Sequence, residues 1–254
     1  MHLLANFELE HNIKILLAVN YGSRSLGYAS EQSDWDLRFI YVHRPEWYFS
    51  LNKQSDVIEL MLDDGHIDIE GYDLKKALTL TSKSNPILSD WLHTNDAYIV
   101  DKSFLKEMHV FEQEYYNPYN TMHSFYYIAV KNNDLSVDKS IALKSFIYYM
   151  RGLLACRWIE RNETHPPMNF DKLIDVTITD NEEVRALAHD LLAIKRKNKS
   201  NDKMIVDERL YRYVADIHRY YEQFLRTFPQ RKSSDDLSQL AKFLMDTSMR
   251  NFAK

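Results

Sequence analysis

The stretch that decides the fold of this chain is residues 22–38, which read Gly-Ser-Arg-Ser-Leu-Gly-Tyr-Ala-Ser-Glu-Gln-Ser-Asp-Trp-Asp-Leu-Arg. It follows the apolar run from Ile13 to Val19, whose length and composition predict a buried strand. A Gly-Ser turn directly after a buried strand can present backbone N–H groups at the start of a helix, where phosphate oxygens bind well. The segment from Asp34 to Val42 alternates polar and apolar residues over its first half, which predicts a half-exposed strand.

Three acidic side chains are the candidate metal ligands. Asp34 and Asp36 occupy positions i and i+2 of the second predicted strand, so they project in one direction about 7 Å apart at Cα and can share a hard divalent cation such as magnesium. Asp68 lies between two isoleucines in a run that predicts a neighbouring strand, and Glu70 on the same side either replaces or assists it. Because phosphoryl transfer commonly uses two metal ions about 3.5–4 Å apart, we expect Asp34, Asp36 and Asp68 to converge on one pocket. Asp68 is the candidate base.

The order Gly22-Ser23, about ten residues, Asp34-x-Asp36, then an isolated acid at Asp68 resembles the DNA polymerase beta-type nucleotidyltransferase superfamily. Further segments resemble one bacterial and phage branch, the predicted nucleotidyltransferases named for an association with an RNA repair pathway. The segments that carry this second resemblance, over roughly residues 13–175, are Gly22–Gly27, Ser33–Arg38, Trp47–Leu51, Asp73–Leu78, Lys83–Pro86, Trp91-Leu92, Lys144, Tyr148, Arg151, Arg157-Trp158 and Pro166–Met168.

The resemblance implies an α+β fold, with a small mixed sheet like the polymerase-beta palm, followed by a helical bundle that closes the nucleotide cleft. It implies transfer of a nucleoside monophosphate from a nucleoside triphosphate to a hydroxyl, with release of pyrophosphate. Asp34, Asp36 and Asp68 would bind two magnesium ions, for which manganese is a substitute, and Gly22 and Ser23 would touch the distal phosphates. Leu26 stands where the family has an aromatic residue, and we expect this departure to alter packing near the loop rather than catalysis.

Four basic residues are candidate nucleotide ligands beside the acids. Arg24 and Arg38 either contact phosphates or neutralise the acidic cluster. Lys144 and Arg151 belong to a stripe on the first long helix of the second half. We expect both to face the cleft, since a closing domain must supply cations to a triphosphate; a solvated helix face is the alternative. The basic run Lys195–Lys199 predicts a solvated helix end, with contact to an RNA backbone as the alternative.

The strand signals of the first half fade from about Val110, which predicts a catalytic domain over residues 1–109 and a helical domain over 110–254. In the first half, Asp73 and Asn85 are predicted to cap two helices. In the second half, helical periodicity extends over Leu135–Glu160, Glu182–Ile194 and Val206–Phe228.

Composition excludes several classes. Five glycines and six prolines in 254 residues argue against a β-rich fold with many tight turns. The single cysteine, Cys156, is expected in the core, and neither it nor the histidines show ligand spacing, so we expect no structural zinc and a cytoplasmic protein. A net charge of -5 argues against non-specific adhesion to nucleic acid over the whole surface, while a local basic groove stays open. No segment approaches the roughly 20 apolar residues that span a bilayer, so no membrane partner is expected.

Two other functions fit the same residues. A catalytically silent nucleotide- or RNA-binding module would keep the fold, although a binder has no need for three mutually repelling acids. Nucleotidylation of a protein side chain would use the same two-metal centre. An RNA end is the favoured acceptor, with a protein or a small molecule as alternatives; the preferred nucleotide and the oligomeric state stay open.

Overall fold

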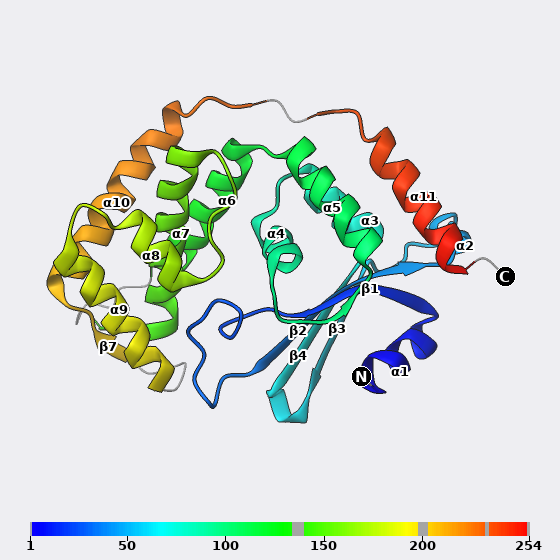
Figure 1. The fold of residues 1–254 in the computed structure, drawn as a ribbon, viewed down its shortest axis with the longest axis horizontal. Coiled ribbons are helices and arrows are strands. Elements are labelled where there is room, and N and C mark those ends of the chain that lie inside the picture. The colour runs from blue at the N-terminus through cyan, green and yellow to red at the C-terminus, as the bar shows by residue number, and fades with distance from the viewer. Residues whose placement is uncertain (1, 134–139, 198–202, 232–233, 253–254) are drawn as a thin grey trace. The chain divides into compact units, whose positions relative to one another are not determined.

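The computed structural model describes residues 2–133, 140–197, 203–231 and 234–252 (Figure 1). These residues divide into two compact units. The first, here called the sheet unit, comprises residues 2–22, 34–116 and 234–252. The second, here called the helical unit, comprises residues 23–33 together with the described part of 117–231. Each unit is described by itself below.

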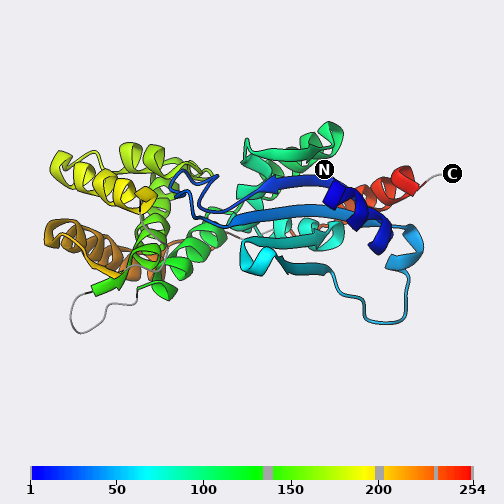
Figure 2. The ribbon, with the colours of Figure 1, turned by 90° about the horizontal axis from the view of Figure 1, so that it is seen from below.

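A five-stranded mixed sheet forms the centre of the sheet unit, in the order β3-β4-β2-β1-β5. Its strands are β1 (Ile13–Asn20), β2 (Trp35–His43), β3 (Val57–Leu62), β4 (Ile67–Asp73) and β5 (Ala97–Val100). The pair β2–β4 is parallel and the other pairs are antiparallel. Figure 2 shows β1 and β2 running side by side along the sheet. The α+β class and the three strands expected from the sequence are confirmed, whereas β3 and β5 were not predicted.

Both faces of the sheet are apolar over part of their area, because alternate strand residues point to opposite sides. One face packs against α3 (Leu74–Ser82), α4 (Pro86–His93), α5 (Lys102–Tyr115) and α11 (Ser238–Phe252), through strand residues such as Val19, Ile40 and Val42. The other face packs against α1 (His2–His11), through Ile15, Phe39 and Ile69 among others. Figure 1 shows α1 on the opposite side of the sheet from α3, α4 and α5. The short elements α2 (Pro45–Tyr48) and η1 (Asp63–Gly65) connect strands.

Polar caps fix the helices that follow the strands. The Asp73 carboxylate accepts from the Lys75 backbone N–H and begins α3, and the Asn85 side chain accepts from Ile87 and Leu88 and begins α4 at Pro86. Such caps satisfy backbone donors that the first helical turn leaves unpaired. Both predicted helix starts are confirmed.

The helical unit contains five helices and a two-stranded ribbon within its described residues. They are α6 (Pro118–Lys131), α7 (Leu143–Asn162), α8 (Phe170–Thr177), α9 (Glu182–Lys197), α10 (Glu208–Thr227), and the antiparallel pair β6 (Ser140–Ala142) and β7 (Lys203–Ile205). Helix α7 is buried on most sides and approaches α6 closely at Gly152, where an added Cβ would lie 2.6 Å from the Phe125 carbonyl oxygen. Cys156 lies in this core, as expected. Residues 135–139 of the predicted helix that begins at Leu135 fall outside the described residues.

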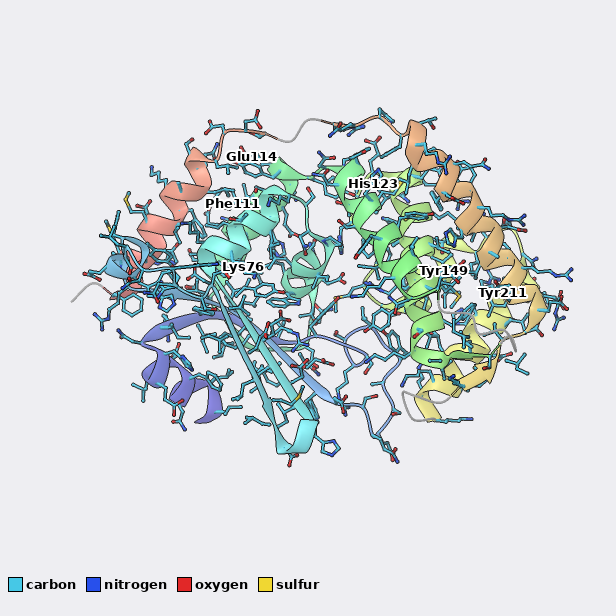
Figure 3. All side chains as sticks on the ribbon, turned by 180° about the vertical axis from the view of Figure 1, so that it is seen from behind. Lys76, Phe111, Glu114, His123, Tyr149 and Tyr211 are labelled. Atoms are coloured by element: carbon cyan, nitrogen blue, oxygen red, sulfur yellow. The ribbon has the colours of Figure 1, made fainter. Side chains whose placement is uncertain are left out.

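The two units differ from the single division expected after residue 109. Residues 23–33 group with the helical unit, and α11 groups with the sheet unit. Phe243 of α11 packs edge-on against Phe111 of α5, which is labelled in Figure 3, with ring centroids 5.2 Å apart. Ser248 of α11 donates to the His43 carbonyl oxygen at 2.7 Å. A helical period shows that α11 has an apolar face but does not show which element that face covers. In the described part of the chain, no helix combines the length and the apolar character needed to cross a membrane.

Asp73 also gives the sheet unit a pH-dependent stability. Burial, partly opposed by a hydrogen bond from the Tyr48 hydroxyl and by backbone N–H donors, raises the pKa of Asp73 to about 6. The folded protein therefore holds a proton that the unfolded chain releases near pH 4, so the free energy of unfolding should fall by about 2 kcal/mol between pH 4.5 and 7. Asp73→Asn keeps a capping side chain and should lack this fall. Urea denaturation of both proteins across this range measures the difference; parallel pH profiles would contradict it.

Candidate active site

The parallel pairing of β2 with β4 brings the predicted acids of the two strands together. Asp36 lies opposite Asp68, and Arg38 lies opposite Glu70. Asp36 and Arg38 alternate with the buried Leu37 and point to the same face of the sheet as Ile40, which packs under the helices. The sheet face that α3–α5 cover therefore becomes charged towards the N-terminal ends of β2 and β4. The acids predicted from the sequence lie at these strand ends.

Arg38 lies at the centre of this charged face. Its Nη2 donates to Asp68 Oδ2 at 2.7 Å and to Asp36 Oδ1 at 3.1 Å, its Nη1 donates to the Asp68 carbonyl at 3.0 Å, and its Nε lies 3.5 Å from Glu70 Oε2. The Arg38 side chain is 11% exposed, whereas the side chains of its three acidic partners are 24–39% exposed. Of the two interpretations left open for Arg38, the observed contacts are those of neutralising the acids.

Gly22 makes room for the Asp36 carboxylate. A Cβ added at Gly22 would lie 1.9 Å from Asp36 Oδ2. Two non-bonded heavy atoms cannot be this close, so one of the two groups would have to move. The preceding backbone N–H, that of Tyr21, donates to the Asp36 carbonyl at 2.8 Å. The glycine of the Gly-Ser turn therefore has a steric role in positioning an acid, in addition to the phosphate contact predicted from the sequence.

Asp34 and the β3 strand extend the acidic surface. Asp34 is exposed and lies one residue before β2 begins. A cavity of about 390 Å³ opens on β3 and β4, lined by Glu59, Leu60, Met61, Asp68 and Glu70. In the described part of the chain, the compact group of three potential metal ligands does not include Asp34, Asp36 or Asp68. Asp36 and Asp68 meet at Arg38, which donates to both carboxylates.

The donors on this face fit a hard cation. Carboxylate oxygens are the ligands that magnesium prefers, and Gly22 leaves the space in which the Asp36 carboxylate lies. A cation bound by Asp36 and Asp68 would take over part of the charge neutralisation that Arg38 supplies. Assignment of the three acids as magnesium ligands stays a prediction.

Residues 23–27 form a turn rather than the helix start expected after the Gly-Ser bend. The Tyr28 N–H donates to the Ser23 carbonyl at 2.9 Å, and the Arg24 guanidinium donates to the Ser33 carbonyl at 2.7 Å. Arg24 thus stabilises its own loop, and its two predicted roles, phosphate contact and neutralisation of the acids, stay predictions. The Arg196 guanidinium holds the same loop through the Gly27 carbonyl, at 2.7 and 2.9 Å. The phosphate contacts assigned to Gly22 and Ser23 stay predictions.

The basic residues predicted in the second half have different environments. Lys144 at the start of α7 is exposed, whereas Arg151 is 4% exposed and its guanidinium lies 5.5 Å from the centre of the Phe125 ring. These two residues therefore do not share a solvated stripe, and their role as triphosphate ligands stays a prediction. The basic run is not a solvated helix end throughout, because Lys195 is buried and Arg196 also pairs with Asp171. Residues 198 and 199 of that run lie outside the described residues.

One cluster was missed from the sequence. His93 at the end of α4 meets His109 and Glu112 of α5, although the histidines showed no ligand spacing. The pair His109 and Glu112, three residues apart on a predicted helix, is a signal that could have indicated half of this cluster.

A mixed sheet with two acids in register on its parallel strands agrees with the arrangement that the sequence resemblance to the polymerase-beta-type nucleotidyltransferases predicts. The chain belongs to the RlaP family, described as the RNA repair pathway DNA polymerase beta family, whose model matches residues 1–246. The family resemblance found in the sequence is thereby confirmed. The chain is 32% identical over 246 residues to the uncharacterized protein YcgL of Bacillus subtilis (strain 168), covering 96% of this chain and 93% of that protein. A crystal structure of a nucleotidyltransferase-like protein from Exiguobacterium sibiricum 255-15 matches 98% of this chain and 79% of its own, at 11% identity and a TM-score of 0.36.

Proposed function

We propose that this protein transfers a nucleoside monophosphate from a nucleoside triphosphate to a hydroxyl acceptor, with magnesium as the cofactor and an RNA end as the favoured acceptor. The observation that carries the proposal is the pairing of Asp36 with Asp68 across parallel strands, beside a glycine that leaves space for the Asp36 carboxylate. Membership of a polymerase-beta-type family supports nucleotidyl transfer in general. The family description supports RNA as the acceptor, and the buried single cysteine agrees with a cytoplasmic location.

In this proposal Asp34, Asp36 and Asp68 hold magnesium, with manganese as a substitute. The metal supplies charge neutralisation on the phosphates and activates the attacking hydroxyl. Asp68 accepts the proton of that hydroxyl, a role that suits the most exposed of the three acids around Arg38. Arg38 holds the Asp36 and Asp68 carboxylates in place by donating to both from one guanidinium nitrogen. Glu70 assists Asp68 rather than replacing it, because Asp68 lies opposite Asp36 in the strand pairing, whereas Glu70 lies opposite Arg38.

The decisive experiment is a transfer assay with each of the four α-labelled nucleoside triphosphates and a short RNA that ends in a 3′ hydroxyl. The wild-type protein should label the RNA and release pyrophosphate in magnesium, and both signals should disappear in EDTA. The double variant Asp34→Asn/Asp36→Asn should be inactive. Asp246→Asn, an exposed aspartate on α11, is the matched control and should retain full activity. Label transfer by the double variant at the wild-type rate would refute the site.

The same assay separates the alternatives. Label on the protein itself, or on added protein substrates instead of RNA, would identify nucleotidylation of a side chain. Calorimetric binding of a nucleoside triphosphate with no transfer to any acceptor would identify a catalytically silent binding module.

A further inference from the structure

A compact group of potential metal ligands lies on α4 and α5, outside the acidic face of β2 and β4. Its three members are His93, His109 and Glu112. One imidazole nitrogen from each histidine and one glutamate oxygen all lie within 4.8 Å of one another. None of these side chains has a part in the proposed nucleotidyl transfer, and all three belong to the sheet unit.

The local sequence explains why these side chains meet. Helix α5 buries Phe104, Met108, Phe111 and Tyr115 in the core of the sheet unit, so His109 and Glu112 occupy the flank of that buried face. Helix α4 buries Leu88, Trp91 and Leu92 in the same core, which leaves His93, its last residue, partly exposed. The two helices are thus fixed by apolar packing that does not depend on the polar cluster.

The distances from the Glu112 carboxylate to the two imidazoles are close to the ligand-to-ligand distances around a bound transition metal. Glu112 Oε2 lies 3.1 Å from His93 Nε2 and 2.9 Å from His109 Nδ1. Zinc bonds of about 2.0–2.2 Å in a tetrahedral arrangement place neighbouring ligand atoms roughly 3.3 Å apart. Each nitrogen is therefore within a few tenths of an ångström of the separation from Glu112 Oε2 that a shared zinc ion needs, and the two nitrogens lie within 4.8 Å of each other. The histidine rings, with centroids 4.8 Å apart and planes inclined by 46°, are not stacked face to face.

A supporting hydrogen bond orients the carboxylate. Ser89, one turn before His93 on α4, donates from its hydroxyl to Glu112 Oε1. This bond occupies one carboxylate oxygen and leaves Oε2 directed at the two imidazoles. Metal ligands commonly have such outer partners, which fix the direction of the ligand atom. The Glu112 side chain is 15% exposed, while those of His93 and His109 are 47% and 35% exposed, so solvent reaches the cluster from the histidine side.

We propose that His93, His109 and Glu112 bind one divalent transition metal ion, zinc by preference, with a solvent molecule completing the coordination. Two imidazoles and one carboxylate suit zinc, whereas magnesium prefers oxygen ligands alone. The ion bridges the C-terminal end of α4 to the middle of α5 and so links two helices that cover the same face of the sheet. This site differs in ligand chemistry from the acids on β2 and β4.

The test uses full-length protein freed of metal with EDTA and titrated with zinc chloride in 5 mM magnesium, which saturates oxygen-only sites. We expect one zinc ion per chain, with a dissociation constant in the micromolar range or tighter, and a rise in the thermal midpoint. Cobalt should give the intense visible absorption of a four-coordinate site rather than the weak bands of the hexaaqua ion. Magnesium alone should not raise the thermal midpoint in this way and should not compete with zinc for the site.

Variants locate the ion. His109→Ala and His93→Ala should each weaken zinc binding by about a hundredfold or more, because loss of a ligand should cost at least as much as the 10–100-fold that loss of a ligand's outer partner costs. His66→Ala, an exposed histidine outside the cluster, should bind zinc as the wild type does. Far-ultraviolet circular dichroism of the metal-free variants checks that they fold. No zinc binding by the wild type at 100 µM, or equal binding by the wild type and His109→Ala, would overturn the proposal.

Discussion

Gly22→Ala is expected to destabilise the protein by about 3 kcal/mol and to lower nucleotidyl transfer on the order of 100-fold. The new Cβ would lie 1.9 Å from Asp36 Oδ2 and 2.6 Å from Asp36 Cγ, so the carboxylate must swing away from its position. That movement breaks the contact with Arg38 Nη2 and displaces a proposed metal ligand. Urea denaturation and the labelled-nucleotide assay measure the two effects.

The steric origin of this effect can be tested by a double-mutant cycle. Asp36→Ala removes both atoms that the Gly22→Ala methyl group would strike hardest, leaving only Asp36 Cβ at 3.1 Å. Adding Gly22→Ala to the Asp36→Ala protein should therefore cost less than 1 kcal/mol, and the difference from the cost in the wild type is the coupling energy of the two sites. An equal cost in both backgrounds would show that Gly22 is needed for its backbone conformation and not for the space it leaves.

Much of the candidate site could be predicted from the sequence because it depends on strand periodicity. Alternation at Asp34–Val42 and at His66–Glu70 predicted two strands, each with acids on one side. The register between the strands could not be predicted, because pairing Asp36 with Asp68 depends on hydrogen bonds between segments about 30 residues apart. The function of Arg38 could not be predicted either, since phosphate binding and neutralisation require the same positive charge.

The elements missed from the sequence had weak or ambiguous patterns. Strand β3 is at an edge of the sheet and has no buried residue, and β5 at the other edge has four residues. Helix α11 has a helical period, but its partner in the sheet unit is far away in the sequence. Lys195 belongs to a run of basic residues that is typical of a solvated helix end, and tertiary packing nevertheless buries it. Each of these features is decided by contacts that a single segment does not encode.

Arg38→Met is expected to destabilise the metal-free protein by about 3 kcal/mol, because it leaves partly buried acids without their shared cation. Asp36, Asp68 and Glu70 then repel one another on one face of the sheet. The surface variant Arg226→Met is the control. Its ion pair with Glu222 joins side chains that are 73% and 54% exposed, so it should change stability by less than about 0.5 kcal/mol.

Magnesium should separate the two roles considered for Arg38. If Arg38 neutralises the acids, millimolar magnesium will raise the thermal midpoint of Arg38→Met more than that of the wild type, since the cation replaces the missing guanidinium charge. If Arg38 instead binds phosphate, Arg38→Met will raise the KM for the nucleoside triphosphate and leave the free energy of unfolding of the metal-free protein unchanged. The contacts with Asp36 and Asp68, at 3.1 and 2.7 Å, lead us to expect the first result. Equal magnesium shifts in both proteins would contradict it, because they would show that magnesium does not neutralise the acids that Arg38 pairs with.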